Sequence, residues 1–361
     1  MHVDFSEKNW QGPATDFSRF DIYPWINELP NKEKVFCSLW ADWWQKDLPP
    51  GYEYYLVVWH TENVDLRWLK QQVKLTKGKI IAVFDGEPYN VKIPGVEFIG
   101  YTELHNDLNK LLKWFGNQEV NNIKKYKFST VCNRVSQGKI WTTTQLLERA
   151  AADSLIILHT DWIEDENVHN WKESGNQYLD NLTNIFKEKY INLEISDGFD
   201  NSLHRLKHTI TGNPWQPIYT DCALHVVAGS FHYSFMMDDV IPYPYIHPGP
   251  DIDEKTLKCL IAGIPFLPGM QFEVYKYLEK FGLRFDYGFD TSFDLDQGNL
   301  SRFEKLCKLI SELSNWSIDN LISATHDATK FNKQHIISGD FYHLCNEYNQ
   351  QQIEKIYKAL S

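Results

Sequence analysis

Residues 249–269 read GPDIDEKTLKCLIAGIPFLPG, which is a loop, a helix and a short apolar strand in direct succession. Asp253 is a favourable N-cap for the helix, and Gly263 and Pro265 are typical of its end. Apolar side chains recur at helical spacing between these limits, at Leu257, Leu260, Ile261 and Ile264. A helix that buries one face and leads directly into an apolar strand is the repeating unit of an α/β fold.

The rest of the chain repeats this alternation of strands and helices. In the first part we expect strands at 35–40, 54–59, 79–84 and 96–101, with helices at 64–75 and 103–115. In the second part we expect strands at 126–132, 154–159 and 224–229, and helices at 142–152, 177–190, 275–281, 300–313 and 350–360. Residues 1–34 are predicted to be loop and turns. The pattern predicts an α/β protein with two Rossmann-like domains facing a cleft, residues 1–120 and 121–361.

Charge is divided unevenly between these parts. Residues 1–139 contain 18 Lys and Arg against 17 Asp and Glu, whereas the remaining residues contain 18 against 31. The net charge of -12 argues against a general polyanion-coating protein, but it leaves a local basic groove open. Seven of the 13 Trp residues precede residue 70, and most of them are expected in the core.

Several common classes of protein are disfavoured by missing motifs. Neither G-x-x-x-x-G-K-[ST] nor G-x-G-x-x-G occurs, which disfavours nucleotide triphosphatases and classical dehydrogenases. The six cysteines are scattered and form no C-x-x-C pair, so they indicate reduced thiols. The sequence has no apolar run long enough to span a membrane and no signal peptide, and it predicts a cytoplasmic protein.

Metal binding is also disfavoured. His204 and His208 share a helix face, but no carboxylate ligand stands near them in the sequence. Two Asp-x-Asp triplets occur, at 251–253 and 294–296, and a pair of this kind can hold a divalent ion. The first stands at a helix start and the second in a turn, so a local structural role is the better interpretation of both. We expect neither a bound metal nor a cofactor.

Glu254 and Lys255 stand in the first turn of the helix that follows Asp253. Free backbone N–H groups and the positive end of the helix dipole favour a diphosphate there, and Lys255 adds a full charge. Glu254 can accept hydrogen bonds from a ribose diol. The alternative is a helix whose acidic first turn only favours folding.

Residues 253–265 resemble the nucleotide-binding signature of the α-1,3-fucosyltransferase family and of related viral and bacterial transferases. In that family Thr-Glu-Lys opens a helix that leads into Ala-Gly-x-Pro. Here Asp253-Glu254-Lys255 leads into Ala262-Gly263-Ile264-Pro265. Residues 277–294 resemble a further stretch of the viral and bacterial relatives. The family would place an aromatic or Asn shortly before the Glu-Lys pair, where this chain has Tyr243, Tyr245 and His247.

Further matches lie upstream. Residues 84–88, FDGEP, resemble the family's Thr-Gly-Glu-Asn turn, whose Glu is the general base; Glu87 aligns with it and Asp85 is a close rival. Cys132-Asn133-Arg134 is similar to the strand that opens the donor domain. A basic residue near that turn binds the diphosphate in the family, and both Arg134 and Lys139 are candidates. Residues 41–44, ADWW, resemble a Trp-Trp pair near the family's amino-terminal strand.

The resemblance implies a GT-B-like glycosyltransferase, with residues 1–120 as the acceptor-side domain and 121–361 as the nucleotide-sugar donor domain. It implies a hexosyl or pentosyl transfer that inverts the sugar and needs no metal. The expected donor-binding residues are Asn133, Arg134, Lys139, Tyr245, Asp253, Glu254 and Lys255. The acceptor is either a glycan or a hydroxymethylated base of phage DNA, and a non-catalytic carbohydrate or nucleotide-sugar binding module is the alternative function.

Basic residues of the first domain bear on the choice of acceptor. Arg67, Lys70, Lys74 and Lys77 recur every three or four residues and can form one helix face. Such a face is usually only solvated, but it would suit a phosphate backbone. The expected acceptor-binding residues are Trp43, Trp44, Arg67 and Lys70. The sequence leaves the oligomeric state open.

Overall fold

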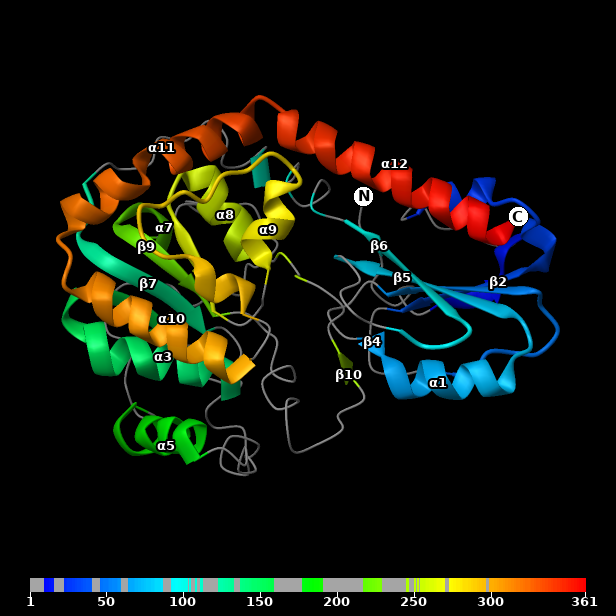
Figure 1. The fold of residues 1–361 in the computed structure, drawn as a ribbon, viewed down its shortest axis with the longest axis horizontal. Helices are drawn as coiled ribbons and strands as arrows, with labels where there is room; N and C mark the ends of the chain where they lie inside the picture. Colours follow the sequence, from blue (N-terminus) through cyan, green and yellow to red (C-terminus); the bar gives the residue numbers. More distant parts are fainter. Residues whose placement is uncertain are drawn as a thin grey trace. The chain divides into compact units, whose positions relative to one another are not determined.

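A computed structural model describes most of the chain (Figure 1). The described residues are 10–15, 23–40, 46–59, 64–86, 92–102, 104, 108, 111–112, 123–132, 137–158, 177–190, 217–228, 245–246, 250, 252, 254–269, 273–296 and 299–361. Contacts divide the chain into two units. Unit 1 is Met1–His105, Pro242–Asp251 and His343–Ser361, and unit 2 is Asn106–Ile241 and Ile252–Tyr342. The functional boundary at residue 120 stays a prediction.

Unit 1 is built on a five-stranded sheet. Four of its strands are parallel, and their bounds agree with the predicted ranges to within one residue. They are β2 (Val35–Trp40), β3 (Tyr54–Trp59), β5 (Lys79–Asp85) and β6 (Val96–Tyr101). The spatial order β1-β2-β3-β5-β6 follows the chain without reversal. These strands form because Val, Ile and aromatic side chains suit a pleated surface that is buried on both faces.

Alternate side chains of the unit 1 strands enter two separate apolar clusters. Leu56, Val58 and Ile81 face one cluster, which also contains Ile353 and Ile356 of helix α12 (Asp340–Leu360). Their neighbours along the strands face the second cluster, together with residues of α1 (Leu66–Leu75). Figure 1 shows α1 and the later turns of α12 on opposite sides of this sheet. The predicted parallel sheet with helices packed against it is therefore confirmed for this unit.

Two predictions for unit 1 were wrong. Residues 10–13, predicted as loop, form strand β1 (Trp10–Pro13), which pairs antiparallel with β2 at the sheet edge, where a proline is tolerated. The helix predicted from residue 64 begins two residues later. Strand β4 (Val64–Asp65) precedes it and pairs with β10 (Tyr245–Ile246), a contact between segments far apart in sequence that local periodicity does not indicate.

Unit 2 is built on four parallel strands. They are β7 (Tyr126–Cys132), β8 (Ser154–Leu158), β9 (Cys222–Val227) and β11 (Phe266–Pro268). The spatial order β11-β9-β7-β8 means that the chain moves outward from β7 in both directions. The prediction of an α/β fold with two parallel sheets flanked by helices is thus confirmed.

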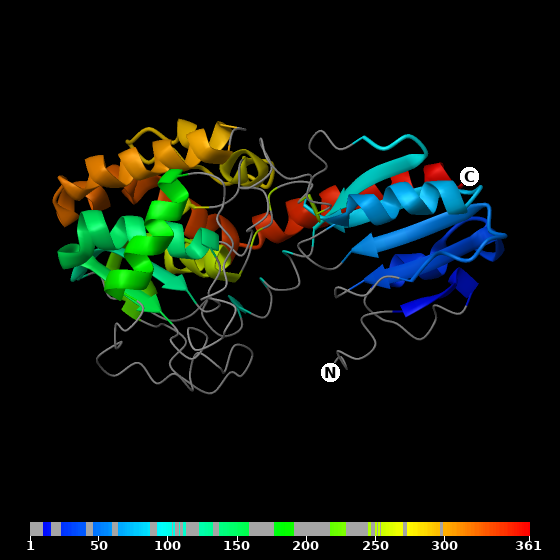
Figure 2. The same ribbon diagram turned by 90° about the horizontal axis from the view of Figure 1, so that it is seen from below.

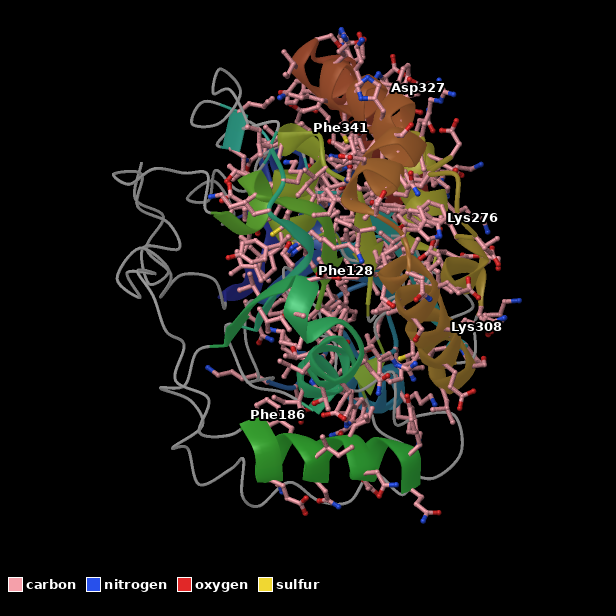
Figure 3. The ribbon with its side chains drawn as sticks, turned by 90° about the vertical axis from the view of Figure 1, so that its left-hand side faces the viewer. Phe128, Phe186, Lys276, Lys308, Asp327 and Phe341 are labelled. Carbon is pink, nitrogen blue, oxygen red and sulfur yellow. The ribbon has the colours of Figure 1, made fainter. Side chains whose placement is uncertain are left out.

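Helices cover both faces of the unit 2 sheet. Helix α3 (Gln137–Ala150) packs with α5 (Gln177–Ile185) and α10 (Asn299–Ser314), whereas α8 (Glu254–Ala262) packs with α7 (Pro217–Thr220) and α11 (Ile318–Ile337). Figure 1 shows these two groups on opposite sides of the strands, and Figure 2 shows the same unit from below, with α5 toward the viewer. Figure 3 looks onto this unit, with Phe128 of β7 in the interior and Lys308 and Asp327 at the periphery.

The largest error in the secondary-structure prediction is α11, a helix of 20 residues that was not predicted. Its buried face includes Thr325, Thr329 and Asn332 beside Leu321 and Ile336, so the apolar stripe is interrupted. The two threonine hydroxyls donate to the carbonyls of Leu321 and Thr325, which satisfies them inside the helix. None of the helices described here is long and apolar enough to cross a membrane.

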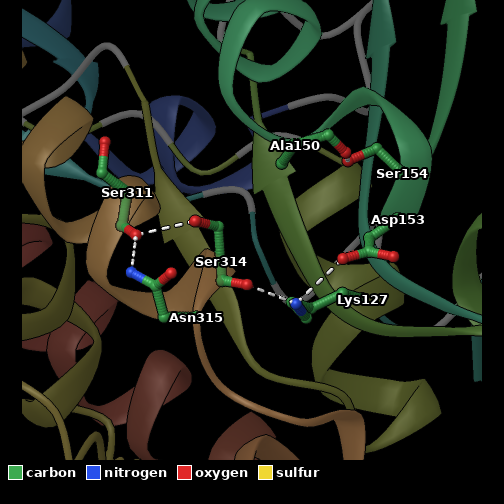
Figure 4. Close-up of polar contacts among 7 residues, drawn as sticks. All are labelled: Lys127, Ala150, Asp153, Ser154, Ser311, Ser314 and Asn315. Carbon is green, nitrogen blue, oxygen red and sulfur yellow. Dashed lines mark hydrogen bonds and ion pairs between the residues drawn. The ribbon is translucent and has the colours of Figure 1, made fainter.

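Lys127 of β7 connects three elements of unit 2. Its side chain is 7% exposed, and Nζ donates to Asp153 Oδ2 at 3.0 Å and to the carbonyl of Ser314 at 2.6 Å (Figure 4). Ser314 is the last residue of α10, and Asp153 ends the short 3-10 helix η5 (Ala151–Asp153). The buried ammonium group therefore ties the start of the central strand to the end of a covering helix.

Candidate functional site

Helices α3 and α8 both begin at the carboxyl edge of the unit 2 sheet. Four residues join the end of β7 to the start of α3, and three join the end of α8 to the start of β11. Short connections require each helix to run antiparallel to its strand, which brings both helix starts to this edge. The strand order reverses between β7 and β9, and ligands of open α/β sheets bind at the carboxyl edge of such a reversal.

The start of α8 carries two residues of the predicted donor site. Lys255 is the second residue of the helix and is 7% exposed, so its cationic side chain is held within the protein. The backbone of Glu254 begins the helix, while its side chain and all of Asp253 lie outside the described residues. The helix ends as predicted, with Gly263 at φ +72° and the N–H of Ile264 donating to the carbonyl of Cys259.

The start of α3 carries a second buried cation. Lys139 is the third residue of this helix and is 2% exposed. Asn133 and Arg134 lie outside the described residues, so the choice between Arg134 and Lys139 as the diphosphate ligand stays open. Helix α3 begins at residue 137 instead of the predicted 142, because Ile140 and Trp141 are both fully buried and extend its packed face.

Close backbone packing marks the same edge at Gly269, directly after β11. Its N–H donates to the carbonyl of Val227 at 2.9 Å, and a Cβ at this position would stand 2.8 Å from that carbonyl. The side chain of Thr142 lies at 3.5 Å from the same point. Only glycine fits at this position. Because Thr142 belongs to the second turn of α3, this turn packs against the carboxyl ends of β9 and β11.

A polar pair at the centre of the unit 2 sheet was not predicted from the sequence. Ser129 of β7 and His225 of β9 are fully buried, with Ser129 Oγ and His225 Nδ1 2.8 Å apart. Because Ser129 donates to the carbonyl of Ile218 at 2.8 Å, its oxygen accepts from Nδ1–H of the imidazole. A lone histidine in an apolar strand gives little sequence signal for such a pair.

The second Asp-x-Asp triplet has the structural role expected of it. Asp294 is 1% exposed and accepts hydrogen bonds from the backbone N–H groups of Val274 and Tyr275, at the start of α9 (Val274–Glu279). Burial raises the pKa of Asp294 to about 7. Asp296 accepts a hydrogen bond from Ser301 and pairs with Lys305 at 2.6 Å. The first triplet has only Ile252 among the described residues.

The predicted general base follows β5 in unit 1. Asp85 is the last residue of that strand, and Gly86 turns the chain with φ +106° while its N–H donates to the carbonyl of Tyr101 at 2.8 Å. This turn needs glycine because its φ lies in the left-handed region. Glu87 and the side chain of Asp85 lie outside the described residues.

The other predicted residues of the first domain are placed in part. The backbone of Arg67 lies in α1, and Lys70 is exposed on the same helix, whereas Trp43 and Trp44 lie outside the described residues. Tyr245 was predicted to bind the donor; its backbone pairs with Asp65, directly before α1 and within unit 1. Other tryptophans are core residues as expected, with Trp25, Trp59, Trp68 and Trp141 all buried.

No group of three or more His, Cys, Asp or Glu residues stands together as a metal site within the described part of the chain. Comparisons with known protein families, with curated proteins and with solved structures find no match to this chain.

Proposed function

We propose that the chain is a glycosyltransferase that moves a hexosyl or pentosyl group from a nucleotide sugar to an acceptor hydroxyl. The observation that carries this proposal is the start of α8, where Lys255 is buried in the first turn of a helix at the carboxyl edge of a parallel sheet with reversed strand order. Helix starts of this kind favour phosphate groups. A donor diphosphate held there is consistent with the GT-B-like fold that the family resemblance implies.

In this proposal Glu87 accepts the proton of the acceptor hydroxyl as the hydroxyl oxygen forms its bond to the anomeric carbon. The bond from that carbon to the diphosphate oxygen breaks on the opposite side, so the sugar is inverted. The leaving nucleoside diphosphate takes the electron pair, and Lys255 with Arg134 or Lys139 stabilises its charge. Each charge-assisted hydrogen bond contributes roughly 1.5–3 kcal/mol, so several of them can replace a metal ion.

The remaining predicted residues complete the two substrate sites. Asn133, Tyr245, Asp253 and Glu254 contact the donor, and Trp43, Trp44, Arg67 and Lys70 contact the acceptor. The proposal so far leaves two acceptors open, a glycan or a hydroxymethylated base of phage DNA. Aromatic side chains stack on sugars and on bases alike, so the tryptophans do not distinguish these two.

The test begins with a thermal-shift panel of nucleotide sugars, which identifies the donor by the base that stabilises the protein. We then expect Glu87→Gln to keep its fold and its donor-induced shift but to lose turnover by ~10²–10⁴-fold, since a positioned general base contributes about that much. Asp85→Asn is the matched variant, and the opposite ranking of the two would make Asp85 the base.

Two further outcomes decide the rest of the proposal. Activity that persists in excess EDTA supports a metal-independent transfer, whereas a loss that Mn²⁺ restores would contradict it. Donor binding without any turnover, left unchanged in Glu87→Gln, would favour the non-catalytic binding module.

A further inference from the structure

Helix α1 and the residues that follow it combine several exposed lysines with an absence of acidic side chains. Residues 66–84 contain Arg67, Lys70, Lys74, Lys77 and Lys79, but no Asp or Glu. Lys70, Lys74 and Lys77 are all exposed. Within the described residues, none of these three has an ion-pair partner, whereas Lys79 pairs with Glu97 at 2.6 Å. This cationic face stands out in a chain whose net charge is -12.

The inner face of the same helix is fixed to unit 1. Trp68 and Leu69 are buried in one of the two apolar clusters, and the side chain of Gln72 is fully buried. Gln72 accepts a hydrogen bond from the N–H of Leu48 and donates to Asp47 at 2.7 Å, so that neighbouring carboxylate is already engaged. The helix is therefore a fixed support that holds Lys70 and Lys74 about one turn, or ~6 Å, apart along its axis.

Helix α1 begins at the edge of the unit 1 sheet where β5 ends. Because α1 follows β3 and precedes β5, its start lies at the carboxyl edge, where Asp85 ends β5 and Gly86 turns the chain. Strands β4 and β10 pair directly before the helix, as Figure 1 shows. A chain of phosphates that follows the lysines from Lys77 to Lys70 thus leads toward this edge.

We propose that this cationic face, Lys70, Lys74 and Lys77, binds the phosphate backbone of duplex DNA. Lysines complement phosphates along a strand, and contacts of this kind position a protein without reading sequence. An anionic membrane fits the face less well, since helices that lie on membranes expose large apolar side chains. Among the described side chains of α1, the apolar Trp68 and Leu69 are buried, and only Leu75 at the helix end is a large apolar residue that is exposed. The inference deepens the proposed function by naming DNA as the acceptor class, and it rests on that function for the role of the bound DNA.

The test compares binding of a duplex DNA by the full chain and two variants, without any nucleotide sugar. The first variant is Lys70→Gln/Lys74→Gln/Lys77→Gln. The matched control, Lys308→Gln/Lys330→Gln/Lys358→Gln, removes the same charge from exposed positions on α10, α11 and α12. Each lost phosphate contact reduces the slope of log affinity against log salt by about 0.9. Between about 50 and 200 mM salt we expect the affinity of wild type to fall ~40-fold more than that of the first variant.

The control should keep the affinity and salt slope of wild type. Absence of DNA binding by the wild type at about 50 mM salt, or equal slopes for wild type and the first variant, would overturn the proposal. Capture of the wild type by phosphatidylserine vesicles but not by DNA would overturn it in favour of a membrane. Because no donor is present, loss of the transferase proposal leaves this DNA result unchanged, and failure here leaves the nucleotide-sugar shifts unchanged.

Discussion

The two units bury different kinds of polar groups. All six charged side chains that are buried among the described residues lie in unit 2, namely Lys127, Lys139, Lys255, Glu273, Asp294 and Arg302. The buried polar side chains described in unit 1 are uncharged, namely Ser38, Gln72, Thr76, Thr102, Asn349 and Gln352. A buried charge costs several kcal/mol unless it is paired, so a protein keeps one where it serves packing or chemistry.

Five of the six buried charges of unit 2 show two kinds of position. Lys127, Glu273 and Asp294 have structural partners, which are the end of α10, Lys276 and the start of α9 respectively. Lys139 and Lys255 stand in the first turns of two helices that begin at one edge of the sheet. Among the described residues, unit 1 is therefore held together by apolar packing and uncharged polar groups. Unit 2 in addition buries charged side chains, two of them at the helix starts where we propose that the diphosphate binds.

The largest expected effect tests the apolar platform. Ile81 is fully buried at the centre of the unit 1 sheet, so Ile81→Ala removes packed volume from the cluster that joins the sheet to α12. We expect the free energy of unfolding to fall by about 2–5 kcal/mol. Urea unfolding followed by tryptophan fluorescence measures this, because Trp25, Trp59 and Trp68 lie in the same unit.

Leu75→Ala is the control for that measurement. Leu75 is 50% exposed at the end of α1, so its loss should change stability by less than about 0.5 kcal/mol. Equal effects of the two substitutions would mean that packing against the sheet is not what holds unit 1 together.

The strands could be predicted closely because their cause is local. Strand β3, Tyr54–Trp59, and strand β7, Tyr126–Cys132, were predicted to the residue, since runs of β-branched and aromatic side chains between turn residues specify a strand directly. Helix α11 could not be predicted in this way. Its buried Thr325, Thr329 and Asn332 look like surface residues until the helix that satisfies them exists.

The candidate site likewise has a part that the local sequence indicates and a part that it does not. Positions beside strand ends and helix starts, such as Asp85 and Lys255, followed from local pattern together with the family resemblance. The pairing of Tyr245 with Asp65 and of Ser129 with His225 depends on contacts between distant segments, for which a single sequence holds no signal. The part of the site that local chemistry specifies was therefore predictable, and the part specified by tertiary packing was not.

The next effect tests the buried acid of unit 2. Burial raises the pKa of Asp294 from 3.8 to about 7 in the folded protein, whereas in the unfolded chain it stays near its ordinary value. Between pH 4 and 7 the folded state therefore binds more protons, and this group makes the free energy of unfolding fall as pH rises, by up to about 1.4 kcal/mol per pH unit. Asp294→Asn removes that contribution.

Urea unfolding of wild type and Asp294→Asn at a series of pH values measures the difference in slope. Asp286→Asn is the matched control, because Asp286 lies on the surface, where its carboxylate pairs with Arg284 at a side-chain exposure of 61%. We expect the control to keep the wild-type slope. If Asp294→Asn also kept the wild-type slope, Asp294 would not have a raised pKa in the folded protein.

The smallest expected effect concerns Lys127, a buried charged side chain with two known hydrogen-bond partners. Lys127→Met keeps an unbranched side chain, one atom shorter, but removes the hydrogen bonds to Asp153 and to the carbonyl of Ser314. Hydrogen bonds to charged groups contribute about 1.5–3 kcal/mol, and Asp153 is 56% exposed and can return to water. We therefore expect a loss of stability near 2 kcal/mol, roughly the lower part of that range.

Lys125→Met provides the contrast two residues away on the same chain. Lys125 pairs with Asp221 at 2.7 Å, but its side chain is 61% exposed, and surface pairs of this kind contribute little to stability. Thermal unfolding of both variants under the same buffer ranks the two lysines. A larger loss of stability for Lys125→Met would show that burial does not determine how much a charged side chain of unit 2 contributes to the free energy of unfolding. The difference in buried charge between the two units would then have no consequence for stability.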